Sequence, residues 1–329
     1  MNNRKIKKVV LALCGIVFVF YYFFNLNLYF CPMNVSGINY DYMLAHDHVE
    51  IEKYKGNRAK VVIPKYIWGK PVTILKRDCF ADNNNMEEVI IPDTVTDVYE
   101  RAFENCGSLK SVTLGKSMKY IGTSVFESDV NLTTVNMNNS IEEIGWFAFN
   151  NCENLKEISL PDSVRKIQTR AFSSSGLERI NIPDSVQKIE PYAFHNTKWL
   201  SNQEGYVICG DQILISYNGT GSKLIIPNGV RAVVDVPWEN SNIKEIYFPD
   251  SVEKIEIDNY TDRSLEFKLY IPESVISIDD GNDLFNHDDV EFVIQKDSYA
   301  EKYAMEYNID FQIEDDIQNL YSEAVDNEK

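Results

Sequence analysis

The chain has 329 residues, of which 44% are hydrophobic and 12% aromatic, and this composition excludes global disorder because it supplies ample apolar surface for a large core. The formal net charge is −18 at pH 7. Such an acidic surface repels phosphate backbones, so the sequence predicts no nucleic-acid partner.

An apolar segment covers residues 9–30 and reads VVLALCGIVFVFYYFFNLNLYF, with two asparagines as its only interruptions. About 20 apolar residues are enough to span a bilayer as a helix. All four charged residues among residues 1–8 are basic and the far end of the segment is aromatic, which predicts a single-pass signal anchor with a cytoplasmic N-terminus and an extracellular remainder. A cleaved signal peptide, which would release a secreted protein, is the alternative interpretation.

Two segments outside the repeats described below resemble each other. Residues 42–64 and 206–227 both contain a strand, a turn, a strand, a Tyr-x-Gly turn, a further strand and a proline. Each pattern predicts a β-hairpin that leads into a new run of repeats. After a linker over residues 31–39, the first hairpin (residues 40–64) is expected to cap the array. The second (residues 199–224) is expected to interrupt it.

A repeat of 22 or 23 residues dominates residues 65–198, and its template is L-x-x-V-x-L-P-x-S-V-x-x-I-x-x-x-A-F-x-x-C-x-x. Its most regular member is a phenylalanine, present at Phe80, Phe103, Phe126, Phe149, Phe172 and Phe194. The alternation in V-x-L predicts a short strand, and the proline that follows ends it because proline has no amide hydrogen. The Ala-Phe pair is expected to fill the interior of each turn.

One such unit cannot bury its apolar side alone, so the repeats are expected to stack into a solenoid with parallel strands. A βαβ sheet is a poor alternative, because 22–23 residues leave no room for a strand, a crossover helix and loops.

From residue 225 to 296 the template persists in a degenerate form, with Trp238, Tyr260 and Phe285 in place of the Ala-Phe pair. Ser298 and Glu301 then fit a capping box, which predicts a helix followed by a last strand, so residues 297–313 are expected to cap the C-terminal end. Residues 314–329 are acidic and mostly polar, and we expect them to form a frayed tail.

The segments IPDTVTDVYERAFENCGSL, LPDSVRKIQTRAF and IPDSVQKIEPYAF resemble the BspA-type leucine-rich-repeat family of microbial surface proteins. The resemblance spans roughly residues 40–313. It implies a right-handed leucine-rich-repeat solenoid with roles in adhesion or host-protein binding, and it implies no catalytic residues. The chain departs from the surface adhesins because no wall-sorting Leu-Pro-x-Thr-Gly motif ends it and its array is short.

Nothing in the sequence indicates an enzyme, since it contains no GxSxG, HExxH, phosphate-loop or dinucleotide-binding motif. His46 and His48 flank Asp47 in the first predicted hairpin turn, which we interpret as a solvated turn in preference to a metal site. The acidic residues 279–289 lack the calcium-loop pattern and are interpreted as a solvated insertion. No catalytic residue, cofactor or metal ion is therefore predicted.

Binding is predicted on the outward side of the repeated strands. The candidate face contains small polar residues in its middle, an acidic and a basic residue beside them, and tyrosines toward the C-terminal end. These residues are Thr113, Asn136, Ser159, Asn181, Glu157, Arg179, Tyr247 and Tyr270. Tyrosines often anchor interfaces, so the face is expected to bind a protein or glycan ligand. A solvated sheet face is the alternative.

The sequence thus predicts a membrane-anchored, externally displayed binding or adhesion module. A structural envelope scaffold that organises partners on its own cell surface is the alternative function.

Overall fold

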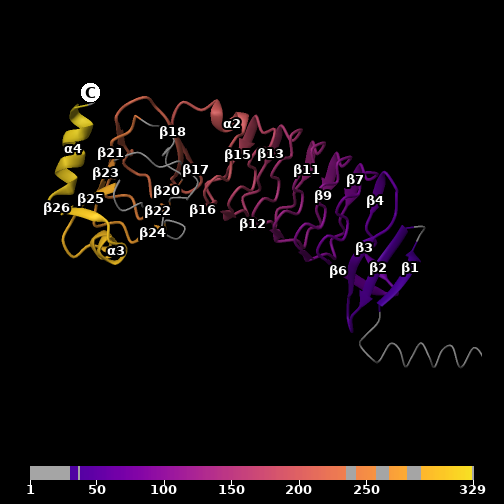
Figure 1. The fold of residues 1–329 in the computed structure, drawn as a ribbon. Helices are drawn as coiled ribbons and strands as arrows, with labels where there is room; N and C mark the ends of the chain where they lie inside the picture. The colour runs from indigo at the N-terminus through magenta and orange to yellow at the C-terminus, as the bar shows by residue number, and fades with distance from the viewer. Residues whose placement is uncertain (1–29, 36–37, 235–241, 257–266, 280–289, 328–329) are drawn as a thin grey trace, which may run out of the picture.

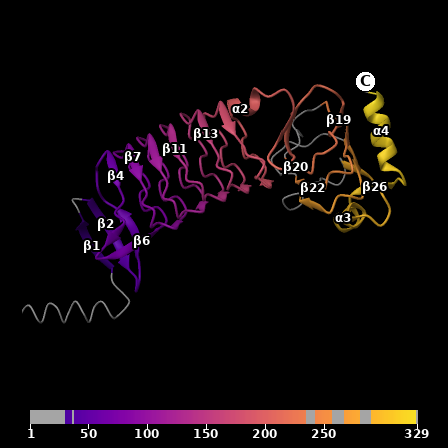
Figure 2. The ribbon, with the colours of Figure 1, turned by 180° about the vertical axis from the view of Figure 1, so that it is seen from behind.

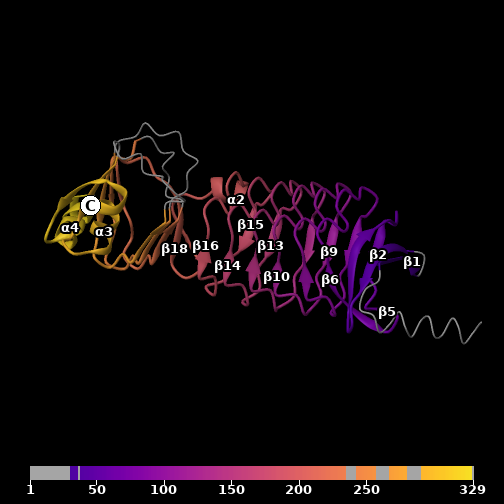
Figure 3. The same cartoon turned by 60° about the horizontal axis from the view of Figure 1, so that its bottom comes forward.

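The computed structural model describes residues 30–35, 38–234, 242–256, 267–279 and 290–327. These residues form an elongated solenoid in which each turn of the chain, called a coil below, stacks on the one before it (Figure 1). Each regular coil contributes one strand to a front row and a shorter strand to a back row, and Figure 3 shows the coils side by side. The predicted solenoid of stacked repeats is confirmed.

The two rows of the N-terminal half consist of short parallel strands. The front row contains β4 (Lys60–Val62), β7 (Glu88–Ile90), β9 (Ser111–Thr113), β11 (Thr134–Asn136), β13 (Glu157–Ser159) and β15 (Arg179–Asn181). The back row contains β8 (Asp97–Val98), β10 (Tyr120–Ile121), β12 (Glu143–Ile144), β14 (Lys166–Ile167) and β16 (Lys188–Ile189). Residues that share a template position pair across neighbouring coils, as the repeat predicts.

A mainly antiparallel sheet closes the N-terminal end. It contains β1 (Phe30–Val35), β2 (Ile38–Leu44), β3 (Val49–Tyr54), β5 (Tyr66–Ile67) and β6 (Lys70–Leu75). β2 and β3 form the predicted hairpin, and β3 then runs parallel to β6. The sequence predicts a linker over residues 31–39, but residues 31–35 belong to β1 and residues 38–39 to β2, and these two strands pair with each other.

The second predicted hairpin separates the two halves of the solenoid. A short helix, α2 (Lys198–Ser201), follows the last Ala-Phe coil and leads into the antiparallel pair β17 (Gly205–Cys209) and β18 (Ile213–Asn218). The front row resumes with β19 (Lys223–Ile225), β21 (Glu245–Tyr247), β23 (Phe267–Ile271), β25 (Val290–Ile294) and β26 (Asp310–Ile313). The back row continues from β18 through β20 (Ala232–Val234), β22 (Lys254–Glu256) and β24 (Ser277–Asp279). Trp238, Tyr260 and Phe285, predicted to replace the Ala-Phe pair here, lie outside the described residues.

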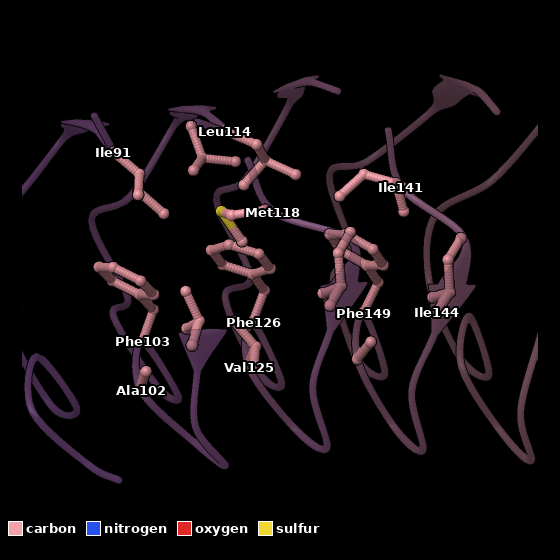
Figure 4. Close-up of a cluster of buried hydrophobic side chains, with 14 of the residues drawn as sticks. Ile91, Ala102, Phe103, Leu114, Met118, Val125, Phe126, Ile141, Ile144 and Phe149 are labelled. Atoms are coloured by element: carbon pink, nitrogen blue, oxygen red, sulfur yellow. The ribbon is translucent and has the colours of Figure 1, made fainter. Parts of the chain in front are cut away.

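Six phenylalanines form a continuous stack through the N-terminal half of the core, and three of them are drawn in Figure 4. Successive ring centroids lie 4.8–5.5 Å apart, and the angle between ring planes decreases from 17° to 4° along the stack. This spacing is close to the separation of paired strands, about 4.8 Å, so each coil delivers one ring to the stack. Phe126 and Phe149 therefore belong to a single core, as the repeat requires.

Aromatic residues from outside the repeat cover both ends of this stack. Tyr54 of the N-terminal sheet stacks on Phe80 at 5.1 Å, and Trp199 of α2 packs edge-on against Phe194 at 5.0 Å. An end coil would otherwise expose its ring to water, because it has a neighbour on one side only. The first hairpin and α2 thus complete the aromatic core.

The turn that carries each Ala-Phe pair contains residues with a left-handed backbone, which the sequence does not reveal. In one regular coil Arg101 and Asn105, on either side of Phe103, have φ angles of 57° and 56°. Left-handed backbone costs an ordinary residue roughly 1–2 kcal/mol. It recurs here because it directs every second amide to the next coil: the amides of Arg101, Phe103 and Asn105 donate to backbone oxygens at 3.0, 3.0 and 2.8 Å.

The C-terminal end contains two helices where one is predicted. Ser298 caps α3 (Tyr299–Tyr307) by accepting a hydrogen bond from the amide of Glu301, and Asn308 ends it in a left-handed conformation. The predicted capping helix and final strand are therefore present. The frayed tail predicted after Glu314 is wrong, because residues Ile317–Asn327 form a further helix, α4, packed on the front row (Figure 2).

The predicted membrane anchor falls almost wholly outside the described residues, which include only its last member, Phe30, as the first residue of β1. Among the residues that the structure does describe, no helix combines the length and apolar character needed to cross a bilayer.

Truncating a ring in the middle of the stack should destabilise the whole N-terminal half. A Phe149→Ala change removes a fully buried ring between two stacked neighbours, and we expect it to lower the free energy of unfolding by about 3–5 kcal/mol. Lys156→Ala, at an exposed position in the next coil, is the matched control and should change it by less than about 0.5 kcal/mol. Equal effects in denaturant-unfolding curves would contradict the stack.

Candidate binding face

The predicted polar residues of the candidate face lie together on the front row of the N-terminal half. Asn136 pairs with Thr113 across β11 and β9, and its amide donates to the Thr113 hydroxyl at 3.3 Å. Ser159 pairs with Asn181 across β13 and β15. Asn136, Ser159 and Asn181 are exposed and Thr113 is partly exposed, so the outward assignment made from the alternation is correct for all four.

One ion pair crosses this polar ladder. The guanidinium of Arg179 contacts the Glu157 carboxylate at 2.7 Å, with the two side chains 69% and 62% exposed. A pair so open to solvent contributes at most about 1 kcal/mol to stability. Its carboxylate and guanidinium therefore remain accessible to a ligand at little energetic cost.

The structure places the two tyrosines in a different environment. Tyr247 and Tyr270 stack on each other with ring centroids 4.1 Å apart and an interplanar angle of 7°. Helix α4 covers them: Ala324 packs against Tyr247, and only 6% of Tyr247 remains exposed. The expectation that Tyr247 lies open to solvent is therefore wrong, whereas Tyr270 remains partly exposed. The front row is open in its N-terminal half and covered at β19, β21 and β23.

Three exposed aromatic residues on the back row were not singled out from the sequence. Tyr99, Tyr120 and Trp146 are 45%, 50% and 51% exposed and belong to three successive coils. The indole nitrogen of Trp146 donates to the Glu190 carboxylate at 2.9 Å, which fixes the ring. The repeat template could have revealed their exposure. Each of the three lies within two residues of the buried isoleucine or valine of its back strand, at a position that the template leaves polar.

Comparison with known proteins agrees with the coil geometry. The model of the BspA type leucine rich repeat region matches six copies over residues 73–201 and 216–307, which is more than half of the chain. The chain belongs to the BspA-type leucine-rich-repeat family. No curated protein sequence matches it.

Several solved leucine-rich-repeat structures are similar to the chain at low identity. A leucine-rich cell surface protein from Faecalibacterium prausnitzii is 22% identical with a TM-score of 0.44, over 76% of this chain and 95% of that one. A leucine-rich repeat protein from Eubacterium ventriosum is 21% identical with a TM-score of 0.43, over 81% and 72%. The T. pallidum leucine-rich repeat protein is 14% identical with a TM-score of 0.40, over 84% and 96%.

Leucine-rich-repeat solenoids of this family are typically binding modules. The titratable residues of the first hairpin turn pair with one another. His48 contacts the Asp47 and Glu50 carboxylates at 2.7 and 3.2 Å, which raises the pKa of its imidazole. The described part of the chain holds no group of three histidine, cysteine or acidic side chains arranged to bind a metal ion. Residues 280–289 of the acidic insertion, and with them His287, lie outside that part.

Asp129 is the one strongly perturbed acid among the described residues, and it lies in the core. It occupies the template position that holds Cys106 and Cys152 in the adjacent coils, where each thiol donates to a phenylalanine carbonyl oxygen at 3.2 and 3.1 Å. One carboxyl oxygen of Asp129 accepts the Cys106 amide at 2.7 Å, and the other is buried with no hydrogen-bond partner. Burial raises the pKa of this carboxyl well above its usual range.

This raised pKa makes the stability of the chain depend on pH. The pKa of Asp129 is higher in the folded protein than in the unfolded chain, where it is about 3.9, so stability falls as the pH rises from there toward the folded-state pKa. Asp129→Asn retains the shape and the acceptor oxygen without ionising. It should match the wild type near pH 4 and be more stable by about 1–3 kcal/mol at pH 8.

Denaturant unfolding at the two pH values measures this difference. Asp162→Asn, at an exposed position, should leave the pH dependence of the wild type unchanged. Parallel stability curves for Asp129→Asn and wild type between pH 4 and pH 8 would contradict the assignment of a neutral, buried carboxyl.

Proposed function

We propose that this BspA-type chain is a surface-displayed binding module whose open front row engages a protein or glycan ligand in adhesion. Residues 9–30 anchor it in the cell membrane and residues 1–8 lie in the cytoplasm, so that the solenoid projects outside the cell. The binding residues are Thr113, Asn136, Ser159 and Asn181 with the adjoining Glu157 and Arg179. In this proposal the chain has no catalytic activity and uses no cofactor.

The observation that carries the proposal is the contrast between the two halves of the front row. Around β9–β15 the face is polar and solvent-exposed, with no described element packed over it, whereas α4 covers β19, β21 and β23. The stacked core beneath the open part holds its backbone rigid. A rigid ladder of small polar side chains loses little conformational entropy on binding, which favours extended contacts with a protein or a sugar chain.

A structural scaffold on the cell's own envelope is the second candidate function. It is favoured by the exposed aromatic residues Tyr99, Tyr120 and Trp146, which lie on the back row. Aromatic side chains are enriched at protein interfaces, so the solenoid offers surfaces on two sides and could hold two partners at once.

Labelling intact cells tests the display of the solenoid. A membrane-impermeant amine reagent should modify exposed lysines such as Lys110 and Lys156, because they lie outside the cell. Lys5, Lys7 and Lys8 should react only after permeabilisation, since the anchor keeps them in the cytoplasm. Their loss from the mature chain would instead indicate a cleaved signal peptide, and protection of the solenoid lysines would contradict display.

Charge substitutions in the ladder test the binding face. Ser159→Lys combined with Asn181→Lys places two bulky cations on the open face and should weaken binding at least tenfold. The measurement is adhesion of beads carrying the full chain to immobilised extracellular-matrix proteins or to envelope fractions. Thr96→Lys with Gln187→Lys adds the same charge at exposed positions on the back-row side and is the matched control. Equal binding by both double variants would remove this face as the site.

The two functions differ in which components the chain retains, matrix proteins or components of the cell's own envelope. An adhesion module retains matrix proteins, and their retention should depend on the ladder. A scaffold retains envelope components, and Trp146→Ala should then reduce retention along with the ladder variant.

A further inference from the structure

Helix α4 lies on the front row through one narrow stripe. Ile317 and Ala324 are its buried residues, and Tyr321 between them donates its hydroxyl hydrogen to the Ile226 carbonyl oxygen at 2.9 Å. Val325 packs beside Ala324 at the C-terminal end of the stripe. Residues spaced by three, four and seven positions face one side of a helix, so α4 presents the apolar side of an amphipathic helix to the sheet.

The surface beneath α4 is flat, aromatic and held in place. Tyr247 and Tyr270 stack in parallel on β21 and β23, and the Tyr247 hydroxyl donates to the Glu245 carboxylate at 2.7 Å. The ammonium of Lys223 lies 5.5 Å from the Tyr247 ring centroid. Fixed tyrosine rings of this kind are the side chains that anchor helices and loops of partner proteins.

The solenoid does not need α4 to close its end. β26 pairs with β25, and α3 packs Ala300, Tyr303 and Ala304 into the C-terminal core. The contact made by α4 forms a separate small cluster around Ile225, Tyr247 and Ala324. The ion pairs Lys223–Glu245 and Lys268–Glu291 join neighbouring strands beneath α4, and the helix sequence IQNLYSEAVDN contains no basic residue.

The charges around Asp250, next to the start of α4, are alike in sign. Asp250 on the sheet side has a raised pKa, first from partial desolvation and then from the neighbouring Glu273 and Asp316 carboxylates. The amide of Gln318 approaches Asp250, but its Nε2 atom is buried and lacks a hydrogen bond of ordinary geometry. A cation at this position would be favoured where α4 supplies a neutral amide.

We propose that the face of β19, β21 and β23 is a docking surface for a basic amphipathic helix of a partner protein, and that α4 occupies this surface in cis until such a helix displaces it. The helix geometry of the occupant follows from α4 itself, which fits the tyrosine pair. The basic character follows from Asp250 and Glu273, and from the net charge of −18, which attracts cationic partners. The proposal rests on the protein-binding role proposed above but uses other residues.

Hydrogen exchange in the full chain tests the charge argument. Gln318→Arg places a guanidinium opposite Asp250 and should slow amide exchange in α4 by about two- to fivefold, as expected for an exposed ion pair. Adding Asp250→Asn should abolish the gain. The preference for a basic helix would be overturned if Gln318→Arg left amide exchange in α4 unchanged. It would also be overturned if the slower exchange persisted after Asp250→Asn was added.

Peptide binding tests displacement. The probes are fluorescent peptides with the sequence of residues 314–327, either native or with the Gln318→Arg change, and anisotropy reports binding to the full chain. Ala324→Glu should undock α4 and raise the affinity of both peptides at least tenfold over wild type, with the arginine peptide binding more tightly. Tyr247→Ala in the Ala324→Glu background should abolish binding.

Failure of either peptide to bind the Ala324→Glu chain, or binding that survives Tyr247→Ala, would overturn the docking surface. Circular dichroism and the unfolding curve of Ala324→Glu establish that its solenoid remains folded. The ladder variants at Ser159 and Asn181 lie outside the surface under α4, so they should leave peptide binding unchanged. Loss of adhesion and loss of peptide docking are therefore separate results.

Discussion

The stack of phenylalanine rings is the constraint on which the rest of the N-terminal half depends. A single coil of 22 or 23 residues cannot enclose its own ring, so each ring is buried only by the coils on either side. The stack therefore requires coils of nearly constant length. It also requires left-handed residues that aim amides along the solenoid and aromatic covers at both ends. Because this core fixes the backbone, the front and back rows present side chains at regular, rigid positions.

The periodic features of the fold could be predicted from the sequence because each depends on a short local pattern. The phenylalanine phase, the prolines after each front strand and the Ser298 cap all express local rules that hold without knowledge of distant contacts. The left-handed residues were not accessible, since Arg101 and Phe147 are side-chain types that rarely adopt that conformation. Their backbone is imposed by hydrogen bonds to the neighbouring coil, which no local pattern encodes.

The candidate face shows the same division. Alternation within each strand correctly placed Thr113, Asn136, Ser159 and Asn181 on the outer side, because strand geometry alone decides that. Whether an outer side is open depends on what packs over it. Tyr247 also points outward from its strand but lies beneath α4, whose apolar stripe is only a few residues within a polar, acidic segment. The composition of this segment therefore predicted a frayed tail. The helix could not be predicted, because its docking depends on a tertiary contact with the tyrosines.

This arrangement bears on how the chain would meet its partners under the proposed binding function. The open polar face belongs to the N-terminal half of the solenoid, while the tyrosine surface belongs to its C-terminal end (Figure 1). The open polar face is accessible to a partner as it stands, whereas the face beneath α4 is accessible only to a partner that displaces this helix. Because the two faces lie in halves of the solenoid with separate hydrophobic cores, a ligand on one face does not occupy the other, and both contacts are compatible in a single chain.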